Sequence, residues 1–131
     1  MRFVPLTLLL TACPSPSTDC TPASITPTGD LAQDLVGTFG SWGIDSPVYY
    51  VFEASGAWCW VEAPNIYATT GLQGEGQWTL DGDLLTIEED NEDGVPYVME
   101  LGVATVDADT LTVDSDGARQ HPRVTCTGYG F

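Results

Sequence analysis

From Val36 onward, short runs of Val, Ile, Thr and aromatic residues alternate with clusters of Gly, Pro, Asp, Asn and Ser. Runs of this composition favour strands, and the clusters between them favour chain reversals. Helical spacing of apolar residues occurs only between Asp30 and Val36, where Asp30 can cap a short helix that carries Leu31 and Leu35. The predicted strands are Val36–Gly43, Val48–Glu53, Ala57–Ala63, Gln73–Leu80, Leu84–Glu89, Tyr97–Val106, Thr110–Asp114 and Arg119–Thr127.

The dipeptide Asp81-Gly82 predicts a hairpin between the two strands that flank it. A type I′ turn needs positive φ at both central residues, and Asp-Gly tolerates this. Asn91–Gly94 and Asp107–Asp109 mark two further reversals. About eight short antiparallel strands must close or fold over, because open edges promote aggregation. We therefore predict an all-β fold, a small antiparallel up-and-down barrel of about eight strands preceded by a short helix.

The turn at Ala54-Ser55-Gly56 sets the register of two aromatic strands. A three-residue loop with Gly56 left-handed places Phe52 opposite Trp58 and Tyr50 opposite Trp60. Cys59 then lies on the other face of the sheet. A two-residue loop would instead turn Cys59 toward the face of Tyr50 and Phe52. We favour the three-residue loop and its aromatic ladder.

Two motifs resemble the lipocalin-like lipoprotein domains of bacteria. Leu35-Val36-Gly37-Thr38-Phe39 is similar to their opening Leu-x-Gly-x-Trp, with Phe39 in place of Trp. The stretch from Gly76 to Ile87 resembles their central Gly-x-Trp-x-Leu-x-Gly-x-x-Leu-x-Ile hairpin. The resemblance covers the chain from about Leu31 to its end and implies a barrel fold. It also implies that a basic residue of the last strand, Arg119 or Arg123, packs on Phe39.

The N-terminal residues 1–12 predict a secretion signal, with Arg2 as its positive end and an apolar stretch from Phe3 to Leu10. That stretch is too short for a bilayer span, which needs about twenty residues. The residues Leu10-Thr11-Ala12-Cys13 resemble the lipobox of bacterial lipoproteins. The resemblance implies cleavage before Cys13, a diacylglycerol thioether on its sulfur and an acylated new amino terminus.

The expected organisation is a signal peptide over 1–12, a lipidated Cys13 with a Pro/Ser/Thr-rich tether over 13–29, and a β domain over 30–131. Such tethers favour extended conformations. Pro14 follows the cysteine where Asp would hold a lipoprotein at the inner membrane of well-studied Gram-negative bacteria. We therefore expect a lipid-anchored protein of the cell envelope, at the outer membrane, on its periplasmic or surface face.

The charge of the chain is strongly acidic, with 19 Asp and Glu against 3 basic residues and a formal net charge of −16. Nucleic acids and anionic lipid surfaces would repel such a chain. The carboxylates gather most densely between Glu88 and Asp93. A solvated acidic hairpin is the simpler interpretation, and weak Ca²⁺ binding is the alternative. The candidate metal ligands are Glu88, Asp90, Glu92 and Asp93.

Three cysteines, Cys20, Cys59 and Cys126, remain if Cys13 carries lipid, and exported proteins meet an oxidising compartment. A bond between Cys59 and Cys126 would join two strands and is favoured. A bond between Cys20 and Cys126, which ties the tether to the last strand, is the alternative.

Catalytic constellations are weak in this sequence. The only His is His121, without a recognisable nucleophile, and we interpret it as an ordinary strand-end residue. No two carboxylates stand out as a glycosidase pair, so we expect a non-enzymatic protein without a cofactor. The first hypothesis is a lipocalin-like lipoprotein that binds a small apolar ligand or acts as an envelope interaction module. It predicts a cavity among Tyr50, Phe52, Trp58, Trp60 and Trp78.

Two other functions stay open. A Ca²⁺-binding or structural module would have a filled barrel and a Ca²⁺-dependent melting temperature. A hydrolase would need two inward carboxylates in a cleft.

Overall fold

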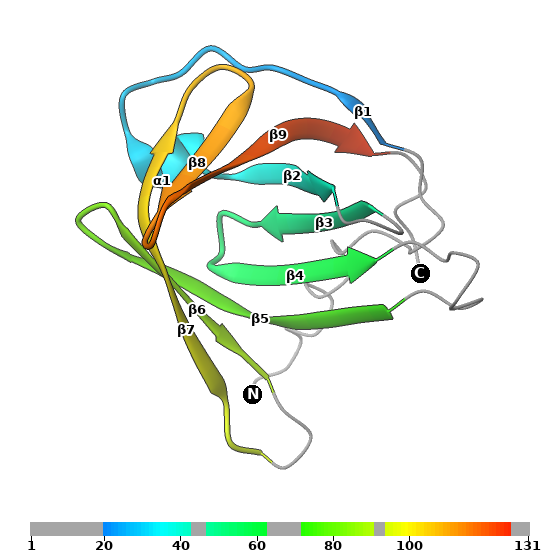
Figure 1. Cartoon of the computed structure of the whole chain (residues 1–131), viewed down its shortest axis with the longest axis vertical. Helices are drawn as coiled ribbons and strands as arrows, with labels where there is room; N and C mark the ends of the chain where they lie inside the picture. The colour runs from blue at the N-terminus through cyan, green and yellow to red at the C-terminus, as the bar shows by residue number, and fades with distance from the viewer. Residues whose placement is uncertain (1–19, 43–46, 63–71, 91–93, 127–131) are drawn as a thin grey trace, which may run out of the picture.

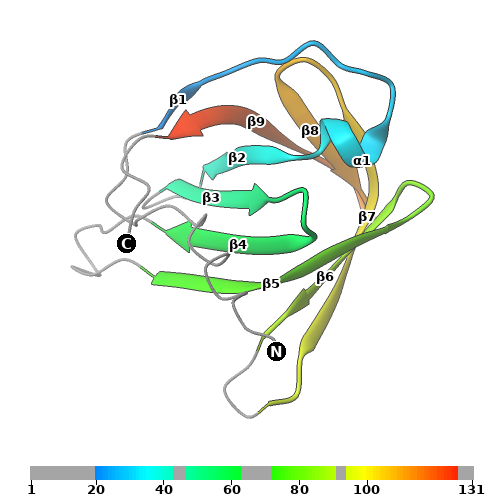
Figure 2. The same ribbon diagram turned by 180° about the vertical axis from the view of Figure 1, so that it is seen from behind.

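The fold is described by a computed structural model, which covers residues 20–42, 47–62, 72–90 and 94–126. Antiparallel strands form a closed eight-stranded barrel with one additional strand (Figures 1 and 2). The elements are β1 (Cys20–Pro22), α1 (Leu31–Asp34), β2 (Gly37–Trp42), β3 (Pro47–Phe52), β4 (Ala57–Glu62), β5 (Leu72–Asp81), β6 (Leu84–Glu89), β7 (Tyr97–Val106), β8 (Thr110–Asp114) and β9 (Ala118–Cys126). The predicted all-β, up-and-down architecture is confirmed.

The barrel closes through β9, which pairs with β8 and also returns to β2. Thr38 and Phe39 of β2 lie opposite Val124 and Arg123 of β9. The added strand β1 lies on the other edge of β9, with Cys20 opposite Cys126. One edge of β9 therefore pairs with β8 along its first half and with β1 at its end, while the opposite edge pairs with β2.

Residues 20–29 were assigned to the tether by the sequence analysis, but the first six of them, 20–25, pair with the barrel. Beyond β1, the amide of Ala23 donates to the carbonyl of Arg123 at 3.0 Å, and the amide of Ile25 donates to that of Ala108 at 2.8 Å. A three-residue strand with one proline carries little hydrophobic pattern, so its composition pointed to a loop. The strand pairing of the barrel therefore includes residues from Cys20, ten residues before Asp30.

The β3–β4 turn has the predicted three-residue loop. The amide of Glu53 donates to the Ala57 carbonyl at 2.9 Å, and Gly56 has a φ of 94°. Phe52 lies opposite Trp58 and Tyr50 lies opposite Trp60, so the predicted aromatic ladder is confirmed.

The β5–β6 hairpin is also present, but its predicted turn was wrong. Asp81 belongs to the ladder opposite Leu84, which leaves Gly82 and Asp83 as the loop. Gly82 has a φ of 66°, whereas no described non-glycine residue has a positive φ. A positive value only at the first central residue fits a type II′ turn, which requires Gly there.

One end of the barrel carries α1 and the β3–β4 and β5–β6 turns (Figure 2). Large buried side chains pack together there. We call this end the closed end; its buried residues are Leu35, Phe39, Trp78, Leu85 and Ala104. Trp78 seals it further, because its indole Nε1 donates to the carbonyl of Glu53 at 2.9 Å. The predicted helix cap is confirmed, since the Asp30 side chain accepts from the amide of Ala32.

Arg123 lies buried at the closed end, with 4% of its surface exposed. Its guanidinium carbon lies 4.6 Å from the centroid of the Phe39 ring, a cation–π contact. The same group donates to the carbonyls of Asp34 at 2.6 Å and Val36 at 3.1 Å. Gly37 leaves room for it, because a Cβ there would collide with the guanidinium. Of the two arginines considered for packing on Phe39, the structure therefore selects Arg123.

The carboxylate of Asp34 organises the segment before α1. It accepts from the Thr28 amide at 2.9 Å, from the Thr28 hydroxyl at 2.8 Å and from the Gly29 amide at 3.1 Å. These bonds, the Thr28 amide foremost, lower the pKa of Asp34 below its usual value near 3.8, although burial opposes them. The ionised carboxylate therefore stabilises the folded chain.

We expect the Asp34→Asn variant to be less stable than the wild type at pH 7. A lowered folded pKa gives stability that is complete well above pH 3.8 and is lost as the pH falls through the folded value. The gap between wild type and variant should thus shrink below pH 3.8. The urea midpoints of wild type and variant, compared at pH 7 and again in acid, measure the stability difference at each pH. A gap of the same size at both would show that ionisation of Asp34 does not contribute.

No helix within the described ranges is long and apolar enough to cross a membrane.

Candidate functional site: the barrel cavity

A cavity of about 680 Å³ lies inside the barrel, toward the end opposite the closed end. Six strands and the β8–β9 turn contribute to its wall. The lining residues are Val48, Tyr50, Phe52, Trp58, Trp60, Ile87, Glu89, Met99, Glu100, Leu101, Leu111, Val113, Ser115, Gly117, Arg119, Gln120 and His121. The predicted cavity of some hundreds of cubic ångströms among aromatic residues is therefore present.

Four of the five predicted lining residues meet in this cavity: Tyr50, Phe52, Trp58 and Trp60. Their strands are neighbours, and alternation sends these side chains inward. The fifth, Trp78, does not line the cavity. It packs edge-on against Phe52 at 5.9 Å between ring centroids, and its bond to Glu53 holds it at the closed end.

The cavity has an apolar floor and a polar mouth. The floor consists of buried side chains, Phe52, Trp58, Ile87, Leu111 and Val113. The mouth consists of residues near the start of β9 and the ends of β6 and β8, chiefly Glu89, Ser115, Arg119 and Gln120. Such a division suits a ligand with a largely apolar body, because burial of apolar surface supplies most of the binding free energy.

Trp60 and Glu89 form a fixed polar contact in the cavity wall. The indole Nε1 of Trp60 donates to Oε2 of Glu89 at 2.9 Å. Gly74, which lies opposite Trp60 in the β4–β5 ladder, makes this contact possible. A Cβ at Gly74 would collide with both the indole nitrogen and the carboxylate oxygen. The glycine thus lets the indole lie across β5 to reach β6.

His121 was interpreted as an ordinary strand-end residue, but it lines the cavity. Its ring meets Tyr50 edge-on, with 5.7 Å between centroids. Burial lowers the pKa of His121 below its usual value near 6.5, and the nearby charge of Arg119 acts in the same direction, whereas a hydrogen bond to the Gly40 backbone opposes them. The available signal was parity: Arg119, His121 and Arg123 alternate along β9, so one inward arginine implied an inward His121.

Two carboxylates line the cavity, Glu89 and Glu100. Glu100 lies opposite Thr86 in the β6–β7 ladder, three positions from Glu89 along β6. Their Cα atoms are therefore about 11 Å apart. Glu100 is also exposed, between Met99 and Leu101, which both pack against the core. This placement gives no support to an acid and base pair across a shared substrate.

The candidate metal ligands of the acidic hairpin are only partly described. Glu88 and Asp90 are exposed, and Glu88 lies opposite Gln77 in the β5–β6 ladder. Glu92 and Asp93 lie outside the described residues. Within the part of the chain that the structure covers, no three His, Cys, Asp or Glu side chains gather as metal ligands would.

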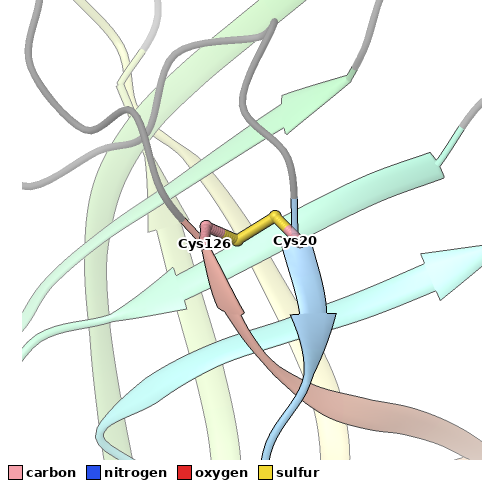
Figure 3. Close-up of a disulfide and its surroundings, with 2 residues drawn as sticks. All are labelled: Cys20 and Cys126. Atoms are coloured by element: carbon pink, nitrogen blue, oxygen red, sulfur yellow. A yellow bond between two sulfur atoms is a disulfide. The ribbon is translucent and has the colours of Figure 1, made fainter.

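A disulfide joins Cys20 of β1 to Cys126 of β9, where the two residues face each other (Figure 3). The favoured bond between Cys59 and Cys126 was therefore wrong. Two strands, β2 and β3, separate β4 from β9 in the sheet. At about 4.8 Å per strand this is roughly twice the Cα separation that a disulfide spans. Cys59 lies on the outer face, as the three-residue turn predicted, and is itself disulfide-bonded.

No protein-family model, no curated protein and no solved structure matched this chain.

Proposed function

We propose that this protein is a non-enzymatic binding protein that holds a small, mostly apolar ligand in its barrel. The cavity is the observation that carries the proposal. Its volume of about 680 Å³ falls within the range of small-molecule sites. Its buried floor is lined by aliphatic and aromatic side chains, and the closed end gives the ligand one route of entry.

The first test is binding of the neutral fluorescent probe N-phenylnaphthylamine. We expect saturable binding of one probe per chain, seen as increased emission. Val113→Trp, which adds bulk to the floor, should weaken binding at least about tenfold, because the new ring takes the place of the probe. Thr112→Trp is the matched control, because Thr112 precedes Val113 in β8 and its side chain projects to the outer face of the barrel, away from the cavity.

Three outcomes would count against the carrier. These are no saturable binding, equal binding by Val113→Trp with its fold retained, or equal loss in Thr112→Trp. If the probe does not bind and Ca²⁺ raises the melting temperature, the acidic module becomes the better function.

The lipid anchor is supported by the lipobox resemblance and needs its own test. Six residues, Pro14 to Asp19, separate Cys13 from β1. Even fully extended, they and the flanking peptide bonds span about 25 Å at most, which would hold the barrel close to the membrane.

Expression in a Gram-negative host and mass spectrometry under non-reducing conditions should show cleavage before Cys13 and the added mass of diacylglycerol and one acyl chain. The Cys13→Ser variant should no longer be found in the membrane fraction. A thioether and a disulfide consume the same sulfur atom. With Cys20 bonded to Cys126, a thioether on Cys13 would leave Cys59 no partner within this chain, so the disulfide of Cys59 argues against the anchor. Finding Cys13 in a disulfide would therefore overturn the anchor and leave the cavity proposal standing.

A further inference from the structure

Two buried polar atoms beside the cavity point to the chemistry of its ligand. We infer that the ligand carries, on its apolar body, a hydrogen-bond acceptor for Trp58 Nε1 and a hydrogen-bond donor for His121 Nδ1, which one or two hydroxyl groups can supply. This inference rests on the proposed function and narrows its ligand class. It separates hydroxylated aromatic or alicyclic compounds from plain hydrocarbons.

Trp58 supplies the donor. Its side chain is 4% exposed, and its indole N–H is buried without an acceptor. Two other indole N–H groups in the described part of the chain do have acceptors. Trp60 donates to Glu89, and Trp78 donates to the Glu53 carbonyl. Buried polar groups in native proteins almost always have a partner, and leaving one unpaired is costly. Trp58 lines the cavity floor, so a ligand in the cavity can provide the acceptor.

His121 supplies the acceptor. The ring is hydrogen-bonded to the Gly40 backbone, and Nδ1 is buried without a partner. The bond to Gly40 is therefore made by Nε2, which in neutral imidazole carries the proton when it donates to a carbonyl. Nδ1 then presents a lone pair, which a hydroxyl hydrogen satisfies.

Tyr50 brings the two groups to one region of the cavity. Its ring lies parallel to that of Trp58, with 6.3 Å between centroids, and edge-on to that of His121 at 5.7 Å. The rings that carry the donor and the acceptor therefore both contact the Tyr50 ring. Among the described side chains the only other buried unpartnered atom is Nε of Arg123, which lies at the closed end and does not line the cavity. The other two unpartnered atoms, Trp58 Nε1 and His121 Nδ1, thus both belong to residues that line the cavity.

The test compares naphthalene with β-naphthol, which differ by one hydroxyl group. The measured quantity is the ratio of their dissociation constants, obtained by calorimetry on the full chain. Trp58→Phe keeps the aromatic ring and removes the donor. We expect it to shift the ratio against β-naphthol by about fivefold, the effect of one neutral hydrogen bond in a buried site. The comparison is a double-mutant cycle between the hydroxyl and the indole N–H, so general packing changes cancel.

Trp60→Phe is the matched control, because its indole N–H already donates to Glu89. It is expected to weaken both probes alike and to leave the ratio unchanged. A third probe, β-naphthyl methyl ether, can accept from Trp58 but cannot donate to His121. The preference of the wild type for β-naphthol over this ether should disappear in His121→Phe.

The outcomes separate the two proposals. If neither naphthalene nor β-naphthol binds, the carrier function fails and the inference with it. If both bind and Trp58→Phe leaves their ratio unchanged, or shifts it no more than Trp60→Phe does, the carrier stands and the hydroxyl inference is overturned. An unchanged preference for β-naphthol over its ether in His121→Phe would remove the acceptor role of His121.

Discussion

Replacing Arg123 by alanine is expected to lower the free energy of unfolding by about 3–4 kcal/mol. The guanidinium donates to the carbonyls of Asp34 and Val36 and lies over the ring of Phe39. The variant removes all three contacts at once and leaves the buried carbonyl of Asp34 without its donor. It also opens a void beside Phe39, which has no exposed surface.

Urea unfolding followed by far-UV circular dichroism measures this effect. Arg119→Ala is the matched control. It removes the same kind of side chain from the same strand, but at the solvent-exposed mouth of the cavity. It should change stability by less than about 0.5 kcal/mol. Arg123→Lys keeps the positive charge but loses the planar fork, so its stability should lie between those of wild type and Arg123→Ala. Equal small losses in both alanine variants would show that Arg123 does not fix the closed end.

Removing the disulfide is expected to have an effect of similar size. Cys20 and Cys126 are 106 residues apart, so the bond closes most of the domain into one loop. Restricting an unfolded chain over a loop of about 100 residues is worth about 4 to 5 kcal/mol in the chain-entropy treatment, and measured effects are often smaller. We expect the Cys20→Ala, Cys126→Ala double variant to lose about 3–4 kcal/mol.

The denaturant dependence gives this prediction a second readout. Without the bond the unfolded chain is more expanded, so the m-value should rise. The control is the double variant Thr21→Ala, Thr125→Ala, which changes the next pair in the same β1–β9 ladder and keeps the disulfide. It should leave the m-value unchanged. A loss below about 1 kcal/mol with no change in the m-value would show that the bond does not restrict the unfolded chain.

Much of the barrel was predictable from local pattern. Tyr97–Val106 and Thr110–Asp114 were predicted with the bounds that the structure gives them. Alternating apolar residues and turn-forming residues were sufficient to locate these strands, because a strand and the turn after it depend mainly on residues close together in sequence. The Ala54-Ser55-Gly56 turn even fixed the register of the aromatic ladder, since its length determines which residues face each other.

What failed depended on contacts between distant segments. β1 is a strand only because the edge of β9 is open beyond the last residue paired with β8. The pairing of Cys126 with Cys20 follows from that placement, which three residues of sequence do not encode. Trp78 shares the inward face with Trp58 and Trp60, but only the carbonyl of Glu53 decides that it seals the closed end. The role of His121 needed the same knowledge of which face of β9 is inward.

The bond between Cys20 and Cys126 also determines how the barrel responds to mechanical load. Tension applied to the two ends of the chain enters at Cys20 and leaves at Cys126, through a covalent bond. The residues between them carry none of that load, so stretching the ends should not unfold the barrel. A reducing agent would turn the same molecule into one whose strands are pulled apart in turn. The disulfide would thus carry the load past the barrel and protect its cavity from mechanical unfolding.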